Sequence, residues 1–560
     1  MKSHFCMEIA TPVPNDKTMT SHAAAGVPAE DAPIVVHGPV NSGGGNTAEY
    51  LSAVADAALP SPLRAGQPRT LGDAEGAGIP DVGPSRGDSG VAPPGEGSLA
   101  ARRAYSLDAL RGLFLILMTL GFAIHGDYFP DWMYHRQFPP PGNLVDVPGI
   151  AWRDLAYAAF LFTMAAALPI TLSRRIEKGE TEVAIVLAAI RRFFMLFMFA
   201  LLIAHSNTFF TGYTQEARAL AIAGFAIMFL IFTRRREDWD ARWHTIVNRA
   251  GWVAAVLFLA LSPLLYDSTF TPTRRDDIIA GLAFAALSGS IIWYFTRDNL
   301  NARLVVLAAT LALYLGARGE GWIQSFWWSS PAPWLFGPSQ LTLLAVVIPG
   351  TIAGDILLKW MRTPATPDAR GTWSGARITL LIVLSLVVAP LVVVGLYSRW
   401  VQGTTQLAIA LCAVGALLTW RPTSPTELLL RRLFSWAALW LILGLVLDPF
   451  EGGIKKVPDT LSYFFTVTGV TMMVMVALVA IVDIRGWRKA VRPLIDVGHN
   501  PMLMYVLYTV FLNSVLELIP SMRPLFRGSP GESILRSLVT TVLVVLIVQI
   551  FTRKRIFWRT

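Results

Sequence analysis

The chain has 560 residues, of which 54% are hydrophobic and only 15% are charged, well below the roughly 25% charged residues of an ordinary soluble protein. This composition excludes a soluble globular fold and predicts a membrane protein whose main partner is the lipid bilayer. The net charge of +9 is the charge expected of basic loops on one side of a membrane, so it gives no argument for nucleic-acid binding.

The first 100 residues differ in composition from the rest of the chain. They are rich in Gly, Ala, Pro, Ser and Asp without periodicity, and they hold five Lys or Arg against eleven Asp or Glu, a net charge of −6. Such a segment cannot bury enough apolar surface to offset the entropy of ordering. We therefore predict a disordered, low-complexity acidic tail over 1–100 and a multi-span transmembrane domain over 101–560.

Apolar stretches long enough to cross a bilayer follow one another from residue 107 to the end of the chain. Arg- and Lys-rich loops recur after every second stretch, which places both termini in the cytoplasm. The pattern predicts an all-α, polytopic transmembrane helical bundle of about 12–14 spans. The stretches lie near 107–128, 152–172, 183–204, 217–233, 250–266, 276–295, 302–318, 338–360, 377–397, 404–420, 430–447, 459–482, 494–513 and 534–551.

The first span begins with residues 105–112 (YSLDALRG) and is followed by two histidines, His125 and His135. Asp108 and Arg111 are three residues apart, so on a helix they lie on one side and can pair with each other. Ionisable residues beside a span are costly, which makes them candidates for function. Imidazole can serve as a general base or as a transient nucleophile, so His135 is a catalytic candidate, and His125 is a second one.

Asp154 stands at the start of the second span, where a carboxylate favours the helix N-terminus. It lies just beyond the loop that carries His135. A carboxylate in this position can also orient an imidazole. Helix capping and orientation of His135 both remain open for Asp154.

Three further charged residues are candidates for substrate binding. Asp355 follows Pro349 and Gly350 inside an apolar stretch, a pattern typical of either an interrupted helix around a midplane site or a simple kink. Glu451 and Lys455 lie in a loop on the side opposite the basic loops. They can contact a sugar or form a solvated charged turn.

A likeness to a known family rests on six segments, 106–112 (SLDALRG), 132–135 (WMYH), 152–157 (WRDLAY), 348–355 (IPGTIAGD), 451–456 (EGGIKK) and 498–501 (GHNP). Together they resemble the heparan-alpha-glucosaminide N-acetyltransferase family, most of all its bacterial branch. The likeness covers roughly residues 100–555, and the bacterial branch implies a place in the inner membrane of a bacterium.

The resemblance implies transfer of an acetyl group from cytoplasmic acetyl-CoA to an amino sugar or glycan on the far side of the membrane. His135 matches by position the histidine that handles the acetyl group in that family, and His125 stands near the place of an asparagine that precedes it. Because no Gly-rich phosphate loop is present, a site for coenzyme A must be built from helix ends and arginines. The arginines expected there are Arg111, Arg174, Arg175 and Arg191 or its neighbour Arg192, and the sequence does not choose among them.

An alternative comes from the same likeness, because some bacterial members resemble inner-membrane permeases for N-acetylglucosamine. In that case the protein is a transporter of N-acetylglucosamine or a related amino sugar and performs no covalent chemistry. No zinc-type spacing of His and Cys and no nucleotide-binding loop is found, so no metal is expected. The sequence leaves the oligomeric state open, including a homodimer.

Overall fold

The computed structural model describes residues 103–124, 129–140, 142–212, 214–265, 271–363, 371–519 and 529–560. The chain divides into two units, Met1–Ala92 and Pro93–Thr560, and every described residue belongs to the second. The predicted acidic tail over 1–100 and the catalytic candidate His125 both lie outside the described residues.

The described part of the chain is helical, with two isolated β-bridges and no β-strand. Short 3₁₀ turns precede or follow several helices, and π-helical turns occupy Val479–Ile484 and Leu507–Leu512. The α-helices are α2 (Tyr105–Ala123), α3 (Leu155–Glu177), α4 (Glu182–Ser206), α5 (Thr208–Thr211), α6 (Gln215–Phe232), α7 (Ala241–Leu265), α8 (Asp277–Thr296), α9 (Leu300–Gly316), α10 (Trp322–Trp328), α11 (Leu344–Arg362), α12 (Gly375–Tyr397), α13 (Val401–Leu418), α14 (Pro425–Leu447), α15 (Leu461–Leu478), α16 (Arg492–Gly498), α17 (Pro501–Val506), α18 (Asn513–Leu518) and α19 (Pro530–Arg553).

Thirteen helical segments within the described ranges are long and apolar enough to cross a membrane, and α9 is a shorter apolar helix. The prediction of an all-helical, multi-pass membrane protein is therefore confirmed. The stretch predicted at 494–513 is divided, because α16 ends at Gly498 and α17 begins at Pro501. Asn500 precedes this proline and adopts φ −130° and ψ 57°, since a residue before proline is excluded from the α-helical region.

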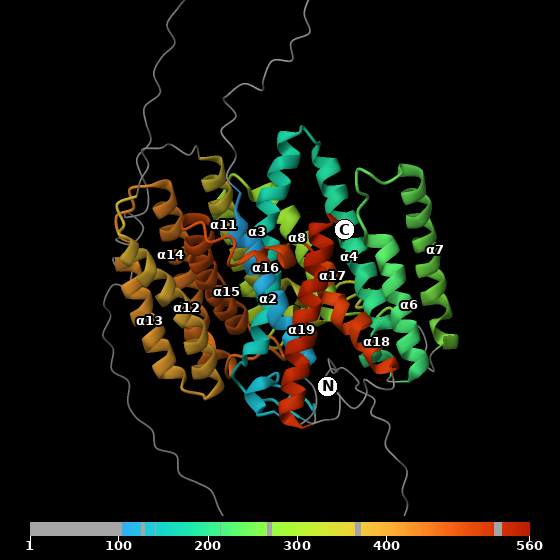
Figure 1. Cartoon of the computed structure of the whole chain (residues 1–560). Helices are drawn as coiled ribbons and strands as arrows, with labels where there is room; N and C mark the ends of the chain where they lie inside the picture. Colours follow the sequence, from blue (N-terminus) through green and yellow to red (C-terminus); the bar gives the residue numbers. More distant parts are fainter. Residues whose placement is uncertain are drawn as a thin grey trace, which may run out of the picture. The chain divides into compact units, whose positions relative to one another are not determined.

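Helix α15 forms the centre of the bundle. It contacts α2, α3, α11, α12 and α14, and its membrane-length segment is 94% buried, against 22% for those of α7 and α13. Figure 1 shows α13 at one flank of the helices and α7 at the opposite flank. The apolar surface of the flanking helices therefore has no protein cover within the described chain and is the surface available to lipid.

Close backbone packing fixes α2 against α16. A Cβ added at Gly112 would lie 1.9 Å from the carbonyl oxygen of Leu494, and one added at Gly498 would lie 1.9 Å from that of Asp108. Only glycine permits this approach at either position. We call this part of the bundle the Arg111 end, and the part beyond the other terminus of α2 the His135 end.

The interrupted helix considered for the segment around Asp355 does not form. Helix α11 runs without a break through Pro349, as proline in a membrane helix can when neighbouring groups satisfy the freed carbonyl. A Cβ at Gly354 would lie 2.4 Å from the carbonyl oxygen of Ala166. The small residues of this stretch thus allow close contact between α11 and α3.

Candidate functional site

Two loops meet at the His135 end. The first, residues 129–151, connects α2 to α3, and its buried Gln137 donates from Nε2 to the carbonyl oxygens of Val147 at 2.9 Å and Gly149 at 3.0 Å. The second, residues 452–460, precedes α15. The N–H of Gly149 donates to the carbonyl oxygen of Ile454 at 2.8 Å, so the two loops are hydrogen-bonded to each other.

Asp154 organises the first loop from the start of the second span. Its side chain is fully buried, and one carboxylate oxygen, Oδ2, accepts the backbone N–H groups of Ala151 at 2.8 Å and Arg136 at 3.2 Å. The other oxygen, Oδ1, lies 2.6 Å from Nδ1 of His135. Asp154 therefore caps the turn that begins the span and also holds the imidazole, which are the two roles that its position in the sequence left open.

The contact between His135 and Asp154 fixes the tautomer of the imidazole. A separation of 2.6 Å between a carboxylate oxygen and a ring nitrogen requires a proton between them, so Nδ1–H donates to Asp154. The other nitrogen, Nε2, then carries a lone pair when the ring is neutral. Nε2 has no hydrogen-bond partner in the described part of the chain, and it is free to accept a proton.

Lys456, from the second loop, completes the cluster. Its Nζ lies 3.2 Å from Nδ1 of His135 and 3.8 Å from Oδ1 of Asp154. Burial lowers the pKa of Lys456. Burial and the ammonium of Lys456 lower the pKa of His135 to about 4, against the opposing effect of the Asp154 carboxylate. The imidazole is therefore neutral at pH 7.

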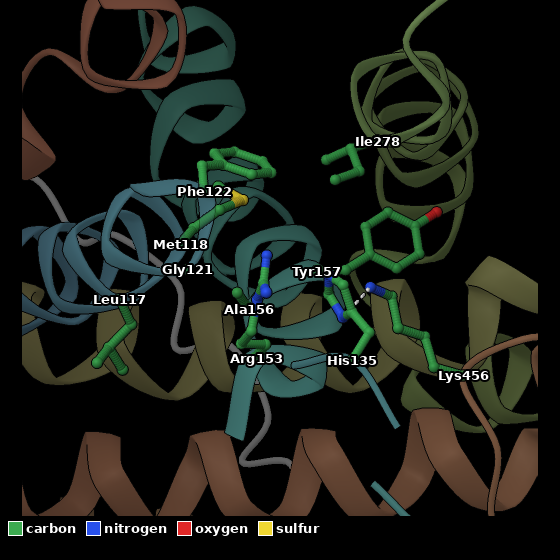
Figure 2. A pocket seen from close by; sticks show the side chains of 10 residues that line it. All are labelled: Leu117, Met118, Gly121, Phe122, His135, Arg153, Ala156, Tyr157, Ile278 and Lys456. Carbon is green, nitrogen blue, oxygen red and sulfur yellow. Dashed lines mark hydrogen bonds between the residues drawn. The ribbon is translucent and has the colours of Figure 1, made fainter. Parts of the chain in front are cut away.

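A small pocket of about 30 Å³ adjoins this cluster, enough for one or two water molecules. Figure 2 marks the 3.2 Å contact between His135 and Lys456 on its wall, with Arg153 and Tyr157 beside them. The lining side chains come mainly from α2, the start of the second span and α8. They are Leu117, Met118, Gly121, Phe122, His135, Arg153, Ala156, Tyr157, Ile278 and Lys456.

The three substrate-binding candidates do not line this pocket. Glu451 accepts the N–H groups of Leu461 at 3.2 Å and Ser462 at 2.6 Å, which caps α15, and it also pairs with Arg318 at 2.9 Å. Lys455 pairs with Asp146 of the first loop at 2.8 Å. Both side chains hold the second loop to its surroundings.

Asp355 lies in a separate cluster within the membrane-length helices. It accepts from Arg303 of α9 at 2.6 Å and from the indole N–H of Trp293 at 2.8 Å. Arg303 is only 1% exposed and also donates to Thr296 and Thr351. A buried cation that is fully paired in this way is a structural cross-link between α8, α9 and α11.

A second charged cluster occupies the Arg111 end. Asp108 accepts from His499 at 3.0 Å and from Arg103 at 3.3 Å, and Arg111 lies 3.6 Å from it. Arg111 also donates to the carbonyl oxygen of Gly498 at 3.3 Å. The pairing of Asp108 and Arg111 considered from the sequence is thus present.

Two further arginines lie beside Arg111: Arg192, which the sequence offered as the alternative to Arg191, and Arg559, which it did not single out. Arg559 donates to the carbonyl oxygen of His499 at 2.8 Å, next to the carbonyl that Arg111 binds, and burial together with the charge of Arg111 lowers the pKa of Arg559 to about 10. Arg192 is close enough for its charge to interact with Arg111, and across the described ranges it has no ion-pair partner. The structure brings these three guanidinium groups together.

The other arginines expected at this end lie apart from that group. Arg174 and Arg191 are exposed, and Arg175 pairs with Glu180 at 2.7 Å. Periodicity could have distinguished Arg192 from Arg191, but no sequence signal places Arg559, which reaches the cluster because Trp558 is fully buried. Lys456 belongs to the segment 451–456 (EGGIKK), which contributes to the family resemblance. Its contact with His135 is visible only in the fold.

Within the described residues, no group of three or more His, Cys, Asp and Glu side chains is placed to hold a metal ion. The arrangement offers instead a neutral, oriented imidazole beside a pocket and a group of arginines at the other end of α2. These are the elements of proton transfer and of anion binding.

The fold and these clusters define a multi-pass helical membrane protein with a His–Asp–Lys cluster at one end. Residues 103–357 are similar to a family described as a domain of unknown function (DUF5009). That match includes His135 and Asp154 and ends before Lys456. A comparison with curated proteins gave no match.

Proposed function

We propose that the protein transfers an acetyl group from acetyl-CoA, bound at the Arg111 end, to an amino-sugar or glycan acceptor at the His135 end. The observation that carries this proposal is the 2.6 Å contact between Nδ1 of His135 and the buried carboxylate of Asp154. It leaves Nε2 as an oriented base beside a pocket. The resemblance of the sequence to an amino-sugar acetyltransferase family supplies the substrate class.

The proposed step is an acyl transfer assisted by a general base. The amino nitrogen of the acceptor attacks the thioester carbonyl, and Nε2 of His135 takes the proton that this nitrogen loses. The carbon–sulfur bond then breaks, and the leaving sulfur of coenzyme A takes that proton back from the imidazolium. Asp154 stabilises the imidazolium that forms at His135. In this scheme His135 is the catalytic base and Asp154 the residue that orients it.

Phosphate binding is assigned to the arginines that the structure brings together at the Arg111 end: Arg111, Arg192 and Arg559. From Arg111 to Gly121, at the pocket, α2 advances ten residues, or about 15 Å at roughly 1.5 Å each. The flexible arm of acetyl-CoA must cover that distance within the bundle. Because the pocket holds only one or two water molecules, the walls formed by α2, α3 and α8 must separate to admit the substrates.

The positive-inside pattern supports the orientation of this scheme. With both termini in the cytoplasm of a bacterium, the Arg111 end faces the cytoplasm, where acetyl-CoA is made, and the His135 end faces outward. The beginning of α2 and the C-terminal segment lie at the same end of the bundle, since Arg103 and Arg559 both contact His499.

The test is the variant His135→Ala in purified protein reconstituted in vesicles. Transfer of radiolabelled acetyl from acetyl-CoA to glucosamine should fall by about 100-fold or more, the usual contribution of a positioned general base. Binding of coenzyme A should stay within about twofold, because the variant leaves the arginines untouched. An unchanged transfer rate would contradict the proposed role of His135.

The same preparation also distinguishes the transporter alternative. A permease would move N-acetylglucosamine into vesicles that contain no acetyl-CoA, and the sugar would arrive unmodified. Such uptake, together with no measurable binding of coenzyme A to the unaltered protein, would replace the enzyme by the transporter.

A further inference from the structure

The His135 cluster contains one carboxylate and two basic groups that both contact it. Nδ1 of His135 lies 2.6 Å from Asp154 and Nζ of Lys456 lies 3.8 Å from the same oxygen, Oδ1. The two basic nitrogens are themselves 3.2 Å apart. Asp154 is fully buried and Lys456 is 17% exposed, so water does little to separate these charges.

If both basic groups were charged, this buried cluster would carry a net positive charge, because it holds only one carboxylate. Lys456 and the carboxylate of Asp154 together are neutral, and protonation of His135 would add an unbalanced cation in a place where isolated charge is costly. The other two ionisable side chains on the pocket wall do not balance that positive charge. Arg153 adds a further positive charge, and Tyr157 is neutral.

We propose that Lys456 is a positioning residue that keeps His135 uncharged, with its proton on Nδ1 and its Nε2 open toward the pocket, by balancing the carboxylate of Asp154. This inference rests on the proposed function for its biological meaning, since an uncharged Nε2 is what a general base requires. Its physical content, the charge state of His135, is independent of any reaction.

The expected charge state without Lys456 follows from the same distances. An imidazole that donates to a carboxylate at 2.6 Å ordinarily gains from being protonated, and an opposite charge so close raises the pKa of histidine by about 1–3 units above its usual value near 6.5. In the intact cluster, burial and Lys456 instead lower the pKa of His135 to about 4. Burial still lowers the pKa of His135 in a variant without Lys456, but the lowering by the ammonium is lost, so a larger fraction of the imidazole carries a proton near neutral pH than in the native protein.

The direct test follows the titration of His135 by NMR in detergent-solubilised protein carrying ¹³C-labelled histidine. The variant His135→Gln identifies the resonance by its loss. In the unaltered protein the resonance should show half-titration below about pH 5, and in Lys456→Met the midpoint should rise by roughly 2 units or more. Lys456→Arg, which keeps the charge, should retain a low midpoint.

Lys455→Met provides a matched control, because this neighbouring lysine pairs with Asp146 and does not contact the imidazole. Its midpoint should equal that of the unaltered protein. The inference fails if Lys456→Met titrates within about half a unit of the unaltered protein, or if the unaltered protein itself titrates at or above about 6.5. The second outcome needs no variant, so it decides the matter even if Lys456→Met does not fold.

Activity separates this inference from the proposed function. If the transferase proposal holds, the acid limb of the pH–rate profile should move upward in Lys456→Met by the same amount as the NMR midpoint, because the rate follows the fraction of neutral imidazole. A shifted NMR midpoint combined with unimpaired transfer by His135→Gln would sustain the role of Lys456 and overturn that of His135 as the base.

Discussion

A cluster of a histidine, a carboxylate and a basic side chain lies at each end of helix α2. The exposed fractions of the two histidines do not reveal how the clusters differ. The side chains of His135 and His499 are 27% and 22% exposed. Their carboxylate partners are Asp154 and Asp108, at 2.6 Å and 3.0 Å. By composition and distance, either pair could be mistaken for the other.

The difference lies in which ring nitrogen is engaged. Nε2 of His499 donates to Asp108 and lies 2.7 Å from Arg103, so it helps to hold α16 against α2. His135 uses Nδ1 for Asp154 and leaves Nε2 beside a pocket. A histidine–carboxylate pair is thus a cross-link in one place and an oriented base in the other, and the pocket beside the imidazole of His135 is the feature that separates them.

The largest expected difference between the two clusters is in what each carboxylate contributes to the free energy of unfolding. Asp154→Ala removes a fully buried carboxylate that accepts from two backbone N–H groups and from His135, and it leaves Lys456 unbalanced, so we expect a loss of about 3–5 kcal/mol. Asp108→Ala removes a carboxylate that is 17% exposed and should cost about 1–2 kcal/mol. Unfolding of both variants by guanidinium, followed by tryptophan fluorescence, measures the two losses. Equal losses would contradict the distinction drawn between the two ends.

A smaller effect concerns packing around α2. Gly112→Ala would place a methyl group 1.9 Å from the backbone oxygen of Leu494, so the helices must separate, at a cost of about 1–3 kcal/mol. Gly121→Ala would meet only the flexible side chain of Arg153, at 3.1 Å, and should cost less than about 1 kcal/mol. Thermal unfolding of the two variants measures this contrast. If Gly121→Ala proved the more damaging, the pocket end would be packed as tightly as the Arg111 end.

The smallest effect is expected from His499. His499→Ala breaks the hydrogen bond to Asp108 and removes the contact with Arg103, both of which are accessible to water. It should lower stability by about 1 kcal/mol and acetyl transfer by less than about fivefold. The readout is the transfer assay used for His135→Ala, with thermal unfolding alongside. A loss comparable to that of His135→Ala would show that the Arg111 end also takes part in the chemistry.

Hydropathy and charge predicted most of the architecture, because a span of given length and apolarity has few alternatives to a helix in a membrane. The segment near Asp355 shows what this reasoning leaves open. Pro349 and Gly350 allowed either a break or a simple kink when α11 was considered by itself. The helix continues because Ala165 and Ala166 of α3 leave room for its glycines and because Arg303 of α9 neutralises Asp355, and neither neighbour is visible in the local sequence.

The candidate site was predictable only where its parts are close in sequence. His135 and Asp154 are 19 residues apart, on either side of one loop, and their contact was among the interpretations that the sequence allowed. Lys456 is 321 residues from His135, and Arg559 reaches Arg111 only because the C-terminal segment folds back. Periodicity describes one element at a time, so contacts between distant elements are beyond it.

The separation between His135 and Lys456 also has a consequence in time. At translation rates of about 5–20 residues per second, the lysine follows the histidine by some tens of seconds. Until it arrives, His135 and Asp154 can form an ordinary ion pair with a protonated imidazole. When the second loop docks, the ammonium of Lys456 makes the protonated imidazole unfavourable. Completion of the bundle is therefore coupled to the release of a proton from His135.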